Sequence, residues 1–312
     1  MENQKEKIAA VVVTYNRKQL LKECLDALLS QTRSLDSIIL IDNASTDGTP
    51  EFLKENGYLD NPKIDYVRLP ENTGGAGGFY EGVKRGYEKG YDWLWLMDDD
   101  GKPLKDTLEL LLRAAKENNL KIINCVVMSD LNEKTLSFGD KAFKNVKDLV
   151  KHPNFKNGII INNIAGPFNG GLLNRKVIEI VGYPNKNYFI YGDEVDYFFR
   201  IKKFFKTGTY IKAIFLHPPC RLKKIQFLGK KFHIFWREES LLNFFYMRNL
   251  CILFRSYPEY ISIKDFFKEI VKRLIFICFF AKEKVKNLKL FLLALFYGLQ
   301  KKFEIPQMLK KT

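Results

Sequence analysis

Blocks of apolar and polar positions alternate over the first two-thirds of this 312-residue chain. Four short apolar runs, rich in β-branched or aromatic side chains, predict buried strands. The first stretch between them repeats leucine at helical spacing, at Leu21, Leu25 and Leu28, and Asn16 is in position to cap that helix. Alternating strands and helices predict an α/β fold, a mostly parallel sheet with helices on both faces. The four strands are residues 8–14, 37–42, 64–69 and 93–97.

The pattern continues with less regularity to about residue 217. We expect a turn at residues 101–103, a helix from Pro103 to about Asn118 and a strand over residues 121–128. Residues 129–157 carry many charges and little periodicity, so they predict no definite element. The later predicted elements are a strand at 158–164, a tight loop at 166–171, a helix at 175–181, an aromatic strand end at 188–191, a helix that carries Arg200, and a last strand ending at His217.

The last third of the chain has a different composition. Residues 221–312 contain 20 basic and 7 acidic side chains, a net charge of +13, whereas the whole chain carries +15. This break predicts two parts, an α/β domain over residues 1–220 and a helical region over residues 221–312. Such basicity favours an anionic partner, either a nucleic acid or an acidic membrane surface.

Aromatic residues among the lysines favour the membrane surface. The apolar runs at 274–281 and 290–299 are shorter than the roughly 18–20 residues needed to span a bilayer. Aromatic faces that alternate with Lys and Arg are typical of helices lying in a membrane interface. The alternative is a helical hairpin that packs on the core and leaves a basic face in water. No helix-turn-helix, zinc-finger or ribonucleoprotein pattern supports a nucleic-acid partner.

The cysteines and the first residues indicate a reducing compartment. Five scattered cysteines include no CxxC pair, which argues against a disulfide framework and against a zinc site. The apolar run that begins at Ile8 is too short for a signal peptide and enters a strand at once. We therefore expect a cytoplasmic protein.

Polar side chains follow the predicted strands. Ligands of open α/β sheets bind at the carboxyl ends of the strands, so these side chains predict one site at that edge. They are Thr14, Tyr15, Asn16, Asp42, Asn72 and the three acids Asp98, Asp99 and Asp100.

Three consecutive acids end the apolar run at 93–97. Adjacent carboxylates repel one another, which a bound cation would relieve. Alternate side chains of an extended chain share a face, so Asp98 and Asp100 can point together at one cation while Asp99 turns elsewhere. Mg²⁺ or Mn²⁺, completed by water and substrate phosphates, suits such a pair. The simpler interpretation is an acidic turn.

Residues 72–78 (NTGGAGG) form a glycine-rich segment before a predicted helix at 77–90. Glycines allow a backbone to approach a phosphate. However, a dinucleotide-binding loop follows the first strand, and a Walker loop ends in Gly-Lys-Ser or Gly-Lys-Thr. We expect either a flexible turn or, beside the acids, one wall of a donor-sugar pocket.

A second acidic pair, Asp193 and Glu194, opens a predicted helix. A carboxylate can take the proton of a hydroxyl that displaces a phosphate leaving group, and this site would complement the metal-binding acids. Asp193 could instead cap the helix. His217 is either a third ligand, since neutral imidazole suits Mn²⁺ better than Mg²⁺, or a structural residue.

Five motifs occur in a fixed order: residues 12–17 (VVTYNR), 41–49 (IDNASTDGT), 72–78 (NTGGAGG), 97–100 (MDDD) and 192–200 (GDEVDYFFR). Together they resemble the family-two glycosyltransferases of the GT-A fold, inverting enzymes that use nucleotide-sugar donors. The resemblance covers roughly residues 7–220. The glycine-rich segment, the acid triplet and the acidic pair resemble the bacterial galactofuranosyltransferase and rhamnosyltransferase branch in particular.

The resemblance implies contacts to the nucleotide-sugar at the sheet edge. Thr14, Tyr15 and Asp42 would hold the nucleobase and the ribose, and Asp99 would face the donor sugar. The complete predicted set is Thr14, Tyr15, Asn16, Asp42, Asn72, Gly75, Asp98 and Asp99.

The resemblance also implies a metal site and a general base. Asp98, Asp100 and His217 would bind Mn²⁺ or Mg²⁺ on the diphosphate. Glu194 would act as the base, with Asp193 beside it as the second acid of the catalytic pair. The branch often has a tryptophan before two aspartates, whereas this chain has Gly192 and Glu194, which implies a differently shaped acceptor pocket.

The sequence therefore predicts a metal-dependent inverting glycosyltransferase with a GT-A domain at 1–220 and a membrane-associating region at 221–312. The first donor choice is UDP-galactofuranose and the second is dTDP-rhamnose. We expect a glycan or lipid-linked glycan acceptor of bacterial surface polysaccharide synthesis, at the inner face of the cell membrane. A non-catalytic nucleotide-sugar-binding subunit and a nucleotidyltransferase stay open as alternatives, as does a homo-oligomer.

Overall fold

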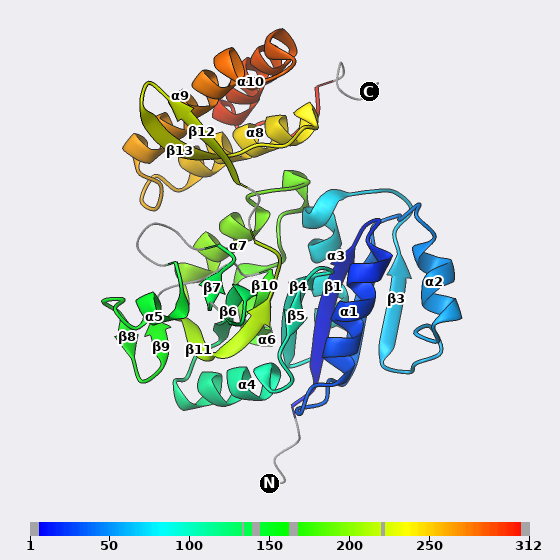
Figure 1. The fold of residues 1–312 in the computed structure, drawn as a ribbon. Helices are drawn as coiled ribbons and strands as arrows, with labels where there is room; N and C mark the ends of the chain where they lie inside the picture. The colour runs from blue at the N-terminus through cyan, green and yellow to red at the C-terminus, as the bar shows by residue number, and fades with distance from the viewer. Residues whose placement is uncertain (1–5, 133, 139–143, 162–167, 220–221, 307–312) are drawn as a thin grey trace. The chain divides into compact units, whose positions relative to one another are not determined.

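The computed structural model describes residues 6–132, 134–138, 144–161, 168–219 and 222–306 (Figure 1). The chain forms two compact units: residues 1–186 with 200–220, and residues 187–199 with 221–312. The predicted boundary after residue 220 differs from this division at residues 187–199. That segment belongs to the second unit because Phe189 and Ile190 pack against its aromatic core.

A large mixed sheet organises the first unit (Figure 1). Its strand order is β3-β2-β1-β4-β10-β6-β11-β9-β8, with β5 and β7 paired at the side. The first four strands are mutually parallel, and β10 runs antiparallel between β4 and β6. The strands are β1 (Ile8–Thr14), β2 (Ser37–Asp42), β3 (Ile64–Arg68), β4 (Trp93–Asp98), β5 (Lys102–Pro103), β6 (Ile122–Asp130), β7 (Thr135–Leu136), β8 (Phe155–Lys156), β9 (Ile159–Ile161), β10 (Asn169–Asn174) and β11 (Thr207–Leu216).

Helices cover both faces of this sheet, which confirms the predicted α/β fold. The leucines of α1 and α4 share a core with Val12 and Trp95. The neighbouring side chain Val11 points to the other face, where it contacts α3 at Gly82. The helices of this unit are α1 (Lys18–Leu29), α2 (Thr49–Glu55), α3 (Gly74–Glu88), α4 (Thr107–Glu117), α5 (Val146–Leu149) and α6 (Arg175–Val181).

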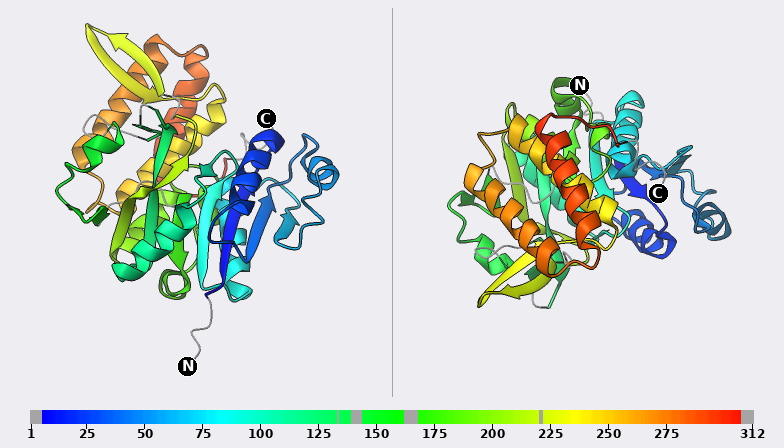
Figure 2. Two further views of the ribbon diagram at one scale, coloured as in Figure 1. Left: turned by 60° about the horizontal axis from the view of Figure 1, so that its bottom comes forward. Right: turned by 90° about the horizontal axis from the view of Figure 1, so that it is seen from above.

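The second unit combines a β-hairpin with three helices that lie side by side (Figure 2). Helix α10 packs along α8 and also contacts α9. Their shared core contains Trp236, Phe244, Phe276 and Phe291. The sequence predicted the helices but not the hairpin. The elements are β12 (Leu222–Phe227), β13 (Lys230–Phe235), α8 (Ser240–Ser256), α9 (Ile263–Phe279) and α10 (Lys284–Leu299), and α7 (Asp193–Lys202) begins in this unit and ends in the first.

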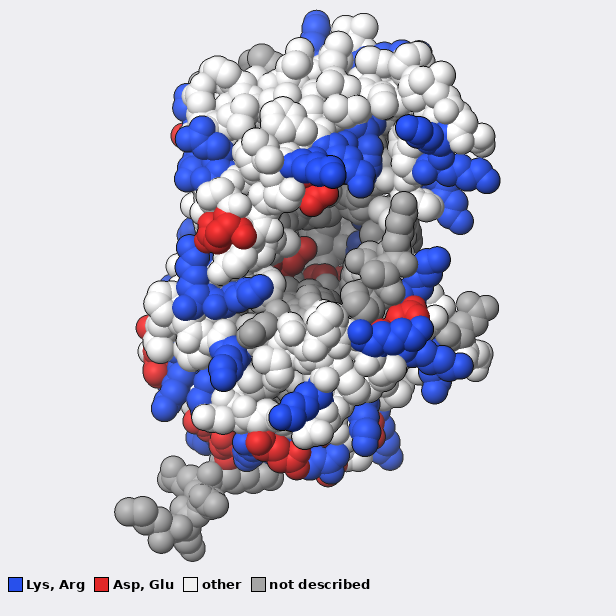
Figure 3. Space-filling model, turned by 90° about the vertical axis from the view of Figure 1, so that its left-hand side faces the viewer, with Lys and Arg blue, Asp and Glu red and all other residues white. Residues whose placement is uncertain are grey.

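Basic side chains lie around uncharged surface on these C-terminal elements. Figure 3 shows Lys and Arg side chains bordering an uncharged area at the top of that view. Among the helices that the structure describes, none has the length and apolar character to cross a bilayer.

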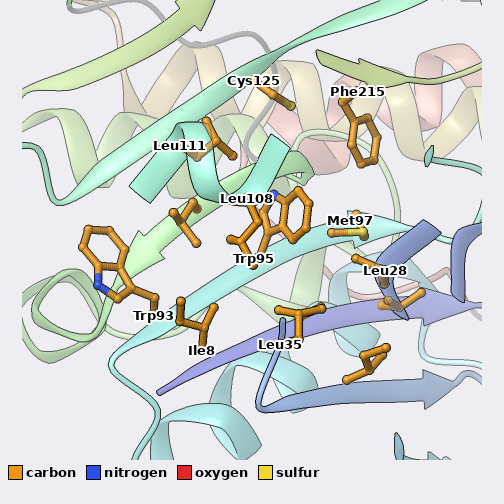
Figure 4. Packing of buried hydrophobic residues seen from close by; sticks show 14 of the residues in the cluster. Ile8, Leu28, Leu35, Trp93, Trp95, Met97, Leu108, Leu111, Cys125 and Phe215 are labelled. Carbon is orange, nitrogen blue, oxygen red and sulfur yellow. The ribbon is translucent and has the colours of Figure 1, made fainter. Parts of the chain in front are cut away.

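Strand β4 lies at the centre of the first core (Figure 4). Trp93, Trp95 and Met97 point to one face, because alternate side chains of a strand share a face. They pack with leucines of α1 and α4 and are shielded from water. The apolar run 93–97 forms the buried part of β4, and Asp98 is the last residue of this strand. The three acids therefore lie at the carboxyl edge of the sheet.

Glycines of the segment 72–78 lie in helix α3, which begins at Gly74. A Cβ added at Gly78 would lie 2.4 Å from Cγ1 of Val13, and one at Gly82 would lie 2.3 Å from Cγ1 of Val11. The helix was predicted to begin at residue 77, so its predicted start was three residues too late. These two glycines allow the helix backbone to approach the sheet.

Several other local predictions were wrong. Asn16 does not cap α1, since its backbone is left-handed (φ 54°) and Lys18 is the first helical residue. Pro103 does not begin a helix, because Lys102–Pro103 pairs with β11 and α4 starts at Thr107. The aromatic segment 188–191 is not a strand end, since a 3-10 turn at Lys186–Tyr188 leads into a loop.

Of the strand predicted at 158–164, residues 159–161 are present as β9, and residues 162–164 lie outside the described residues. Residues 162–167, which include the start of the predicted loop at 166–171, lie outside the described residues. The helix predicted at 175–181 is present as α6.

Candidate active site

Asp99 joins the ends of two neighbouring strands. Because β1 and β4 are parallel partners, the residues that follow them meet at one edge of the sheet. The Thr14 hydroxyl donates to Oδ2 of Asp99 (2.7 Å), and the Tyr15 amide donates to the same oxygen (3.4 Å). Burial raises the pKa of Asp99 to about 6, against the lowering effect of Arg17. Asp99 thus orders the β1–α1 loop, and its expected position facing the donor sugar stays a prediction.

Arg17 and His217 flank Asp100. Nη1 of Arg17 lies 2.9 Å from Oδ2 of Asp100 and 3.3 Å from Oδ1 of Asp99. Nε2 of His217 lies 3.2 Å from Oδ1 of Asp100, while Nδ1 donates to the Pro218 carbonyl (2.6 Å). With its proton on Nδ1, a neutral ring presents an Nε2 lone pair to a carboxylate oxygen. Two acceptors at this distance need a proton or a cation between them.

The contact shifts the pKa of both groups. Burial works against the charge on His217, but the Asp100 carboxylate outweighs burial and raises the His217 pKa. Burial likewise acts to raise the pKa of Asp100, but the contact with His217 and the charge of Arg17 keep it below its usual value. Apart from Nε2 of His217, the buried Oδ1 of Asp100 has no hydrogen-bonding group beside it in the described part of the chain.

This donor set fits a divalent cation. A buried carboxylate oxygen beside an imidazole nitrogen offers one hard and one borderline ligand, which Mn²⁺ accepts more readily than Mg²⁺. Within the described residues, no three His, Cys, Asp or Glu side chains gather into a metal cluster. A cation at Asp100 and His217 would therefore take its other ligands from water and a diphosphate.

Asp98 does not join Asp100 and His217 in a three-ligand cluster. The prediction assumed an extended chain through all three acids. Instead β4 ends at Asp98, and a turn follows in which the Gly101 amide donates to the Asp98 carbonyl (3.4 Å). The alternation of side chains stops at this turn, so Asp99 and Asp100 share Arg17. The role of Asp98 toward a metal or a nucleotide-sugar stays a prediction.

Asp42 lies in a closed network at the end of β2. Its side chain has no exposed surface. Oδ2 accepts from the Tyr66 hydroxyl (2.7 Å) and Oδ1 accepts from the Ser45 amide (2.8 Å), with Nε of Arg68 3.8 Å away. Burial and this hydrogen bond raise the pKa of Tyr66 well above its ordinary value. A nucleobase could reach the Asp42 carboxylate only after one of these partners moved.

Asn16 and Asn72 stabilise the loops around this edge. Oδ1 of Asn16 accepts from the Thr46 amide (2.6 Å), which links the loops that follow β1 and β2. Oδ1 of Asn72 accepts from the Gly74 amide (2.8 Å) at the start of α3. At Gly75 an added Cβ would meet nothing within 4 Å, so this residue borders open space, as a pocket wall would.

The acidic pair lies in the second unit, at the start of α7. Asp193 and Glu194 are the first two helical residues, and the capping role considered for Asp193 stays a prediction. Burial raises the pKa of Glu194, and a hydrogen bond with Asp193 acts in the opposite direction. A carboxylate with a raised pKa is a stronger base than an ordinary surface acid.

The family model for Glycosyl transferase family 2 matches residues 9–179, more than half of the chain. The chain belongs to this family. The match contains every predicted site residue from Thr14 to Asp100 and ends before Asp193. As a family 2 glycosyltransferase, the protein is an enzyme of glycosyl transfer, and the expected family and fold are confirmed.

Curated relatives and solved structures agree with this assignment. The chain is 33% identical to galactofuranosyltransferase GlfT1 of Mycolicibacterium smegmatis, over 78% of the chain and 82% of that protein. It is 30% identical to GlfT1 of Mycobacterium tuberculosis, over 78% and 81%. The fold resembles S. aureus TarS 1–349 in complex with UDP, with TM-score 0.54, 14% identity and coverage of 95% and 88%. A longer TarS structure gives TM-score 0.55 and 13% identity, and the chain spans 46% of its length.

The candidate site of this family 2 enzyme also contains residues that the sequence patterns did not predict. Arg17 forms ion pairs with Asp99 and Asp100. The repulsion among three adjacent acids was the available signal, because a basic side chain can relieve it as well as a metal ion can. Asn43 accepts from the Thr73 amide (2.9 Å) and donates to the Gly74 carbonyl (2.8 Å), and so connects β2 to α3. Its place after a strand end was the available signal.

Proposed function

We propose that this enzyme transfers galactofuranose from UDP-galactofuranose to a hydroxyl of a glycan or lipid-linked glycan, with inversion and with Mn²⁺ or Mg²⁺. The two GlfT1 relatives support the sugar, and the TarS complex with UDP supports the nucleotide. The observation that carries the proposal is the buried Oδ1 of Asp100, which lies 3.2 Å from Nε2 of His217. A dTDP-rhamnose donor stays the second candidate, since the motifs also resemble rhamnosyltransferases.

The nucleotide-sugar would lie along the carboxyl edge of the sheet. Thr14 ends β1 and Tyr15 follows it, both held by Asp99, and Asn72 and Gly75 flank the start of α3. Parallel strands β1, β2 and β4 bring these loops to one edge. A divalent cation held by Asp100 and His217 would supply positive charge to the leaving diphosphate.

Glu194 would be the general base. It takes the proton of the acceptor hydroxyl while the oxygen forms a bond to the anomeric carbon. The bond from that carbon to the diphosphate breaks, and UDP leaves with the electron pair. The raised pKa of Glu194 suits this role, because the efficiency of a base improves as its pKa approaches the working pH.

A panel of donors tests the proposed reaction. We expect UDP-galactofuranose to bind in the presence of Mn²⁺ and to lose about tenfold or more in affinity when EDTA replaces the metal. Calorimetry with UDP-galactofuranose, UDP-galactopyranose and dTDP-rhamnose provides the comparison. Tighter binding of dTDP-rhamnose would favour the second candidate. Binding without turnover on any acceptor would favour a non-catalytic subunit, and binding unaffected by EDTA would remove the metal role of Asp100 and His217.

The same proposal includes peripheral attachment to an anionic bilayer through the second unit. Leu228, 85% exposed, lies at the tip of the β12–β13 hairpin in a left-handed conformation (φ 47°) that leucine rarely adopts. The ring of Phe227 lies 4.7 Å from that of Phe279 and 6.5 Å from that of Phe280, and both of these residues are exposed. We call Leu228, Phe279 and Phe280 the tip patch.

Lysines around the tip patch complement a negatively charged membrane. Lys230 is the cross-strand partner of Phe227, and Lys231 follows it. Lys282 and Lys284 lie two and four residues after Phe280, and all four lysines are exposed. Apolar side chains that enter the acyl boundary beneath a basic rim are typical of peripheral membrane proteins. The patch would place the enzyme where a lipid-linked acceptor resides.

Charge placed in the tip patch should release the enzyme from vesicles. We expect the double substitution Leu228→Glu and Phe279→Glu to weaken co-sedimentation with phosphatidylglycerol vesicles about tenfold or more, since it removes two exposed apolar side chains that would enter the membrane. Phe204→Glu in the first unit is the control, because Phe204 is 64% exposed and Phe279 59%. Unchanged sedimentation of the double variant would refute the patch. Deleting residues beyond 260 is a poorer test, because it removes core residues such as Phe276 and Phe291.

A further inference from the structure

We infer that Asn249 is a positioning residue that holds the loop before Glu194 in its active conformation. The inference rests on the proposed role of Glu194 as the general base. Asn249 lies in the middle of helix α8 and is 1% exposed. No sequence motif of the family resemblance included it.

The Asn249 side chain binds three backbone carbonyls of the loop. Its Nδ2 donates to the carbonyls of Tyr188 (3.0 Å), Ile190 (2.8 Å) and Tyr191 (2.8 Å). Its Oδ1 accepts from Nε of Arg248 (2.9 Å), which fixes which end of the amide faces the loop. An amide nitrogen has only two hydrogens, so one of them is shared between carbonyls. The Asn249 side chain therefore holds the backbone of this loop against α8 through three hydrogen bonds.

Arg248 of the same helix adds a further hydrogen bond to this loop. It is fully buried, and its Nη2 donates to the Tyr188 carbonyl (3.0 Å) while Nη1 donates to the Phe303 carbonyl (2.7 Å). Its guanidinium also lies 4.9 Å from the ring centre of Phe245. Two neighbouring side chains of α8 thus share one carbonyl of the loop.

The loop has a backbone that its own residues do not favour. Phe189 and Tyr191 both have φ of 65°, and Gly192 has φ of 87°. Aromatic residues rarely adopt a positive φ, and such conformations persist only where the surroundings impose them. The hydrogen bonds from Asn249 and Arg248 supply that constraint. Without them the loop would relax toward ordinary backbone angles.

The loop sets the start of α7 and with it the position of Glu194. The Gly192 carbonyl accepts from the Asp196 amide (2.8 Å) in the first turn of the helix. Gly192 packs against α8, where an added Cβ would lie 3.1 Å from Cδ1 of Leu253. The same turn is tied to the end of α8, because the Tyr257 hydroxyl donates to Asp196 (2.7 Å). Helix α8 therefore positions the base through both the loop and the first helical turn.

Replacing the amide by a carboxylate tests the inference with almost no change of shape. We expect Asn249→Asp to lower kcat about 100-fold, with KM for UDP-galactofuranose within twofold of wild type, since the donor loops belong to the first unit. The acid limb of the pH–kcat profile should also move, because Glu194 loses its defined surroundings. Donor consumption with a synthetic alkyl galactofuranoside acceptor provides the rates, measured well below the melting temperature of each variant.

Two further variants keep the inference falsifiable. Asn287→Asp is the matched control, because Asn287 is a buried amide of α10 that donates to the Glu283 carbonyl of its own helix (3.0 Å). It should leave kcat and the pH profile of folded enzyme unchanged. If Asn249→Asp does not fold, Tyr257→Phe removes the anchor on Asp196 and should lower kcat about tenfold with KM retained.

The results separate this inference from the proposed function. Wild-type kcat and pH profile in folded Asn249→Asp, together with an inactive Glu194→Gln, would overturn the positioning role alone. Equal losses in Asn249→Asp and Asn287→Asp would reduce the role of Asn249 to stability and would also overturn it. Full turnover in Glu194→Gln would instead remove the base assignment on which the inference depends.

Discussion

Glu194→Gln should lower kcat about 1000-fold while UDP-galactofuranose binds as tightly as to wild type. The amide keeps the size and the hydrogen-bonding shape of the side chain but cannot accept the proton of the acceptor hydroxyl, and general-base catalysis of this kind contributes about 10²–10⁴-fold. Donor binding persists because the predicted nucleotide-sugar residues belong to the first unit. Steady-state rates and calorimetric donor affinity are the two measurements.

The pH dependence of the wild-type enzyme provides a second check on this residue. Burial raises the pKa of Glu194, so the base is protonated and inactive up to a higher pH than an ordinary glutamate. The acid limb of kcat should therefore lie above the usual titration range of a carboxylate and should be absent from the residual activity of Glu194→Gln. Glu239→Gln, which changes an exposed acid of the same unit, is the control. A variant at position 194 with wild-type turnover would exclude Glu194 as the base.

The strands of the first unit could be predicted because the sheet is covered on both faces. Residues buried on both sides of a parallel sheet give continuous apolar runs, as β1, β2 and β4 do. The β12–β13 hairpin gives no such run, since exposed and half-buried residues alternate along β12. Its turn has positive φ at Leu228 (47°) and Gly229 (74°). Turns of this kind usually have the sequence Asn-Gly, whereas this one has Leu228-Gly229, so the sequence did not indicate a hairpin.

Only those residues of the candidate site that come directly after a strand could be predicted from the sequence. Thr14, Asp42 and the acids were identified in this way, because their position depends on the local chain alone. The turn after Asp98 was missed, and with it the pairing of Asp99 and Asp100 with Arg17, 82 or 83 residues away. Asn249 was missed for the same reason, since it contacts carbonyls 58 to 61 residues earlier in the chain. Contacts of this range have no local signature.

Asp100→Asn should abolish the metal dependence of donor binding. The substitution removes one negative charge from the pair that Asp100 forms with His217, and an amide oxygen is a weaker ligand for a hard cation than a carboxylate. We expect UDP affinity in the presence of Mn²⁺ to fall to the value measured in EDTA, and kcat/KM to fall about 100-fold or more, because the diphosphate loses its counter-charge. Calorimetry with UDP and paramagnetic resonance of free Mn²⁺ measure the two binding steps separately.

Two comparison variants test which acids are needed for Mn²⁺-dependent UDP binding. Asp60→Asn, an exposed acid of the same unit, should leave Mn²⁺-dependent UDP binding unchanged. Asp98→Asn tests the acid at the end of β4, and a loss equal to that of Asp100→Asn would add Asp98 to the ligands of the donor-bound state. If Asp100→Asn lowers only the melting temperature, the carboxylate serves the ion pairs with Arg17 and His217 and the cation must bind elsewhere. The Asp100–His217 contact therefore makes a prediction that binding measurements can reject without any knowledge of the acceptor.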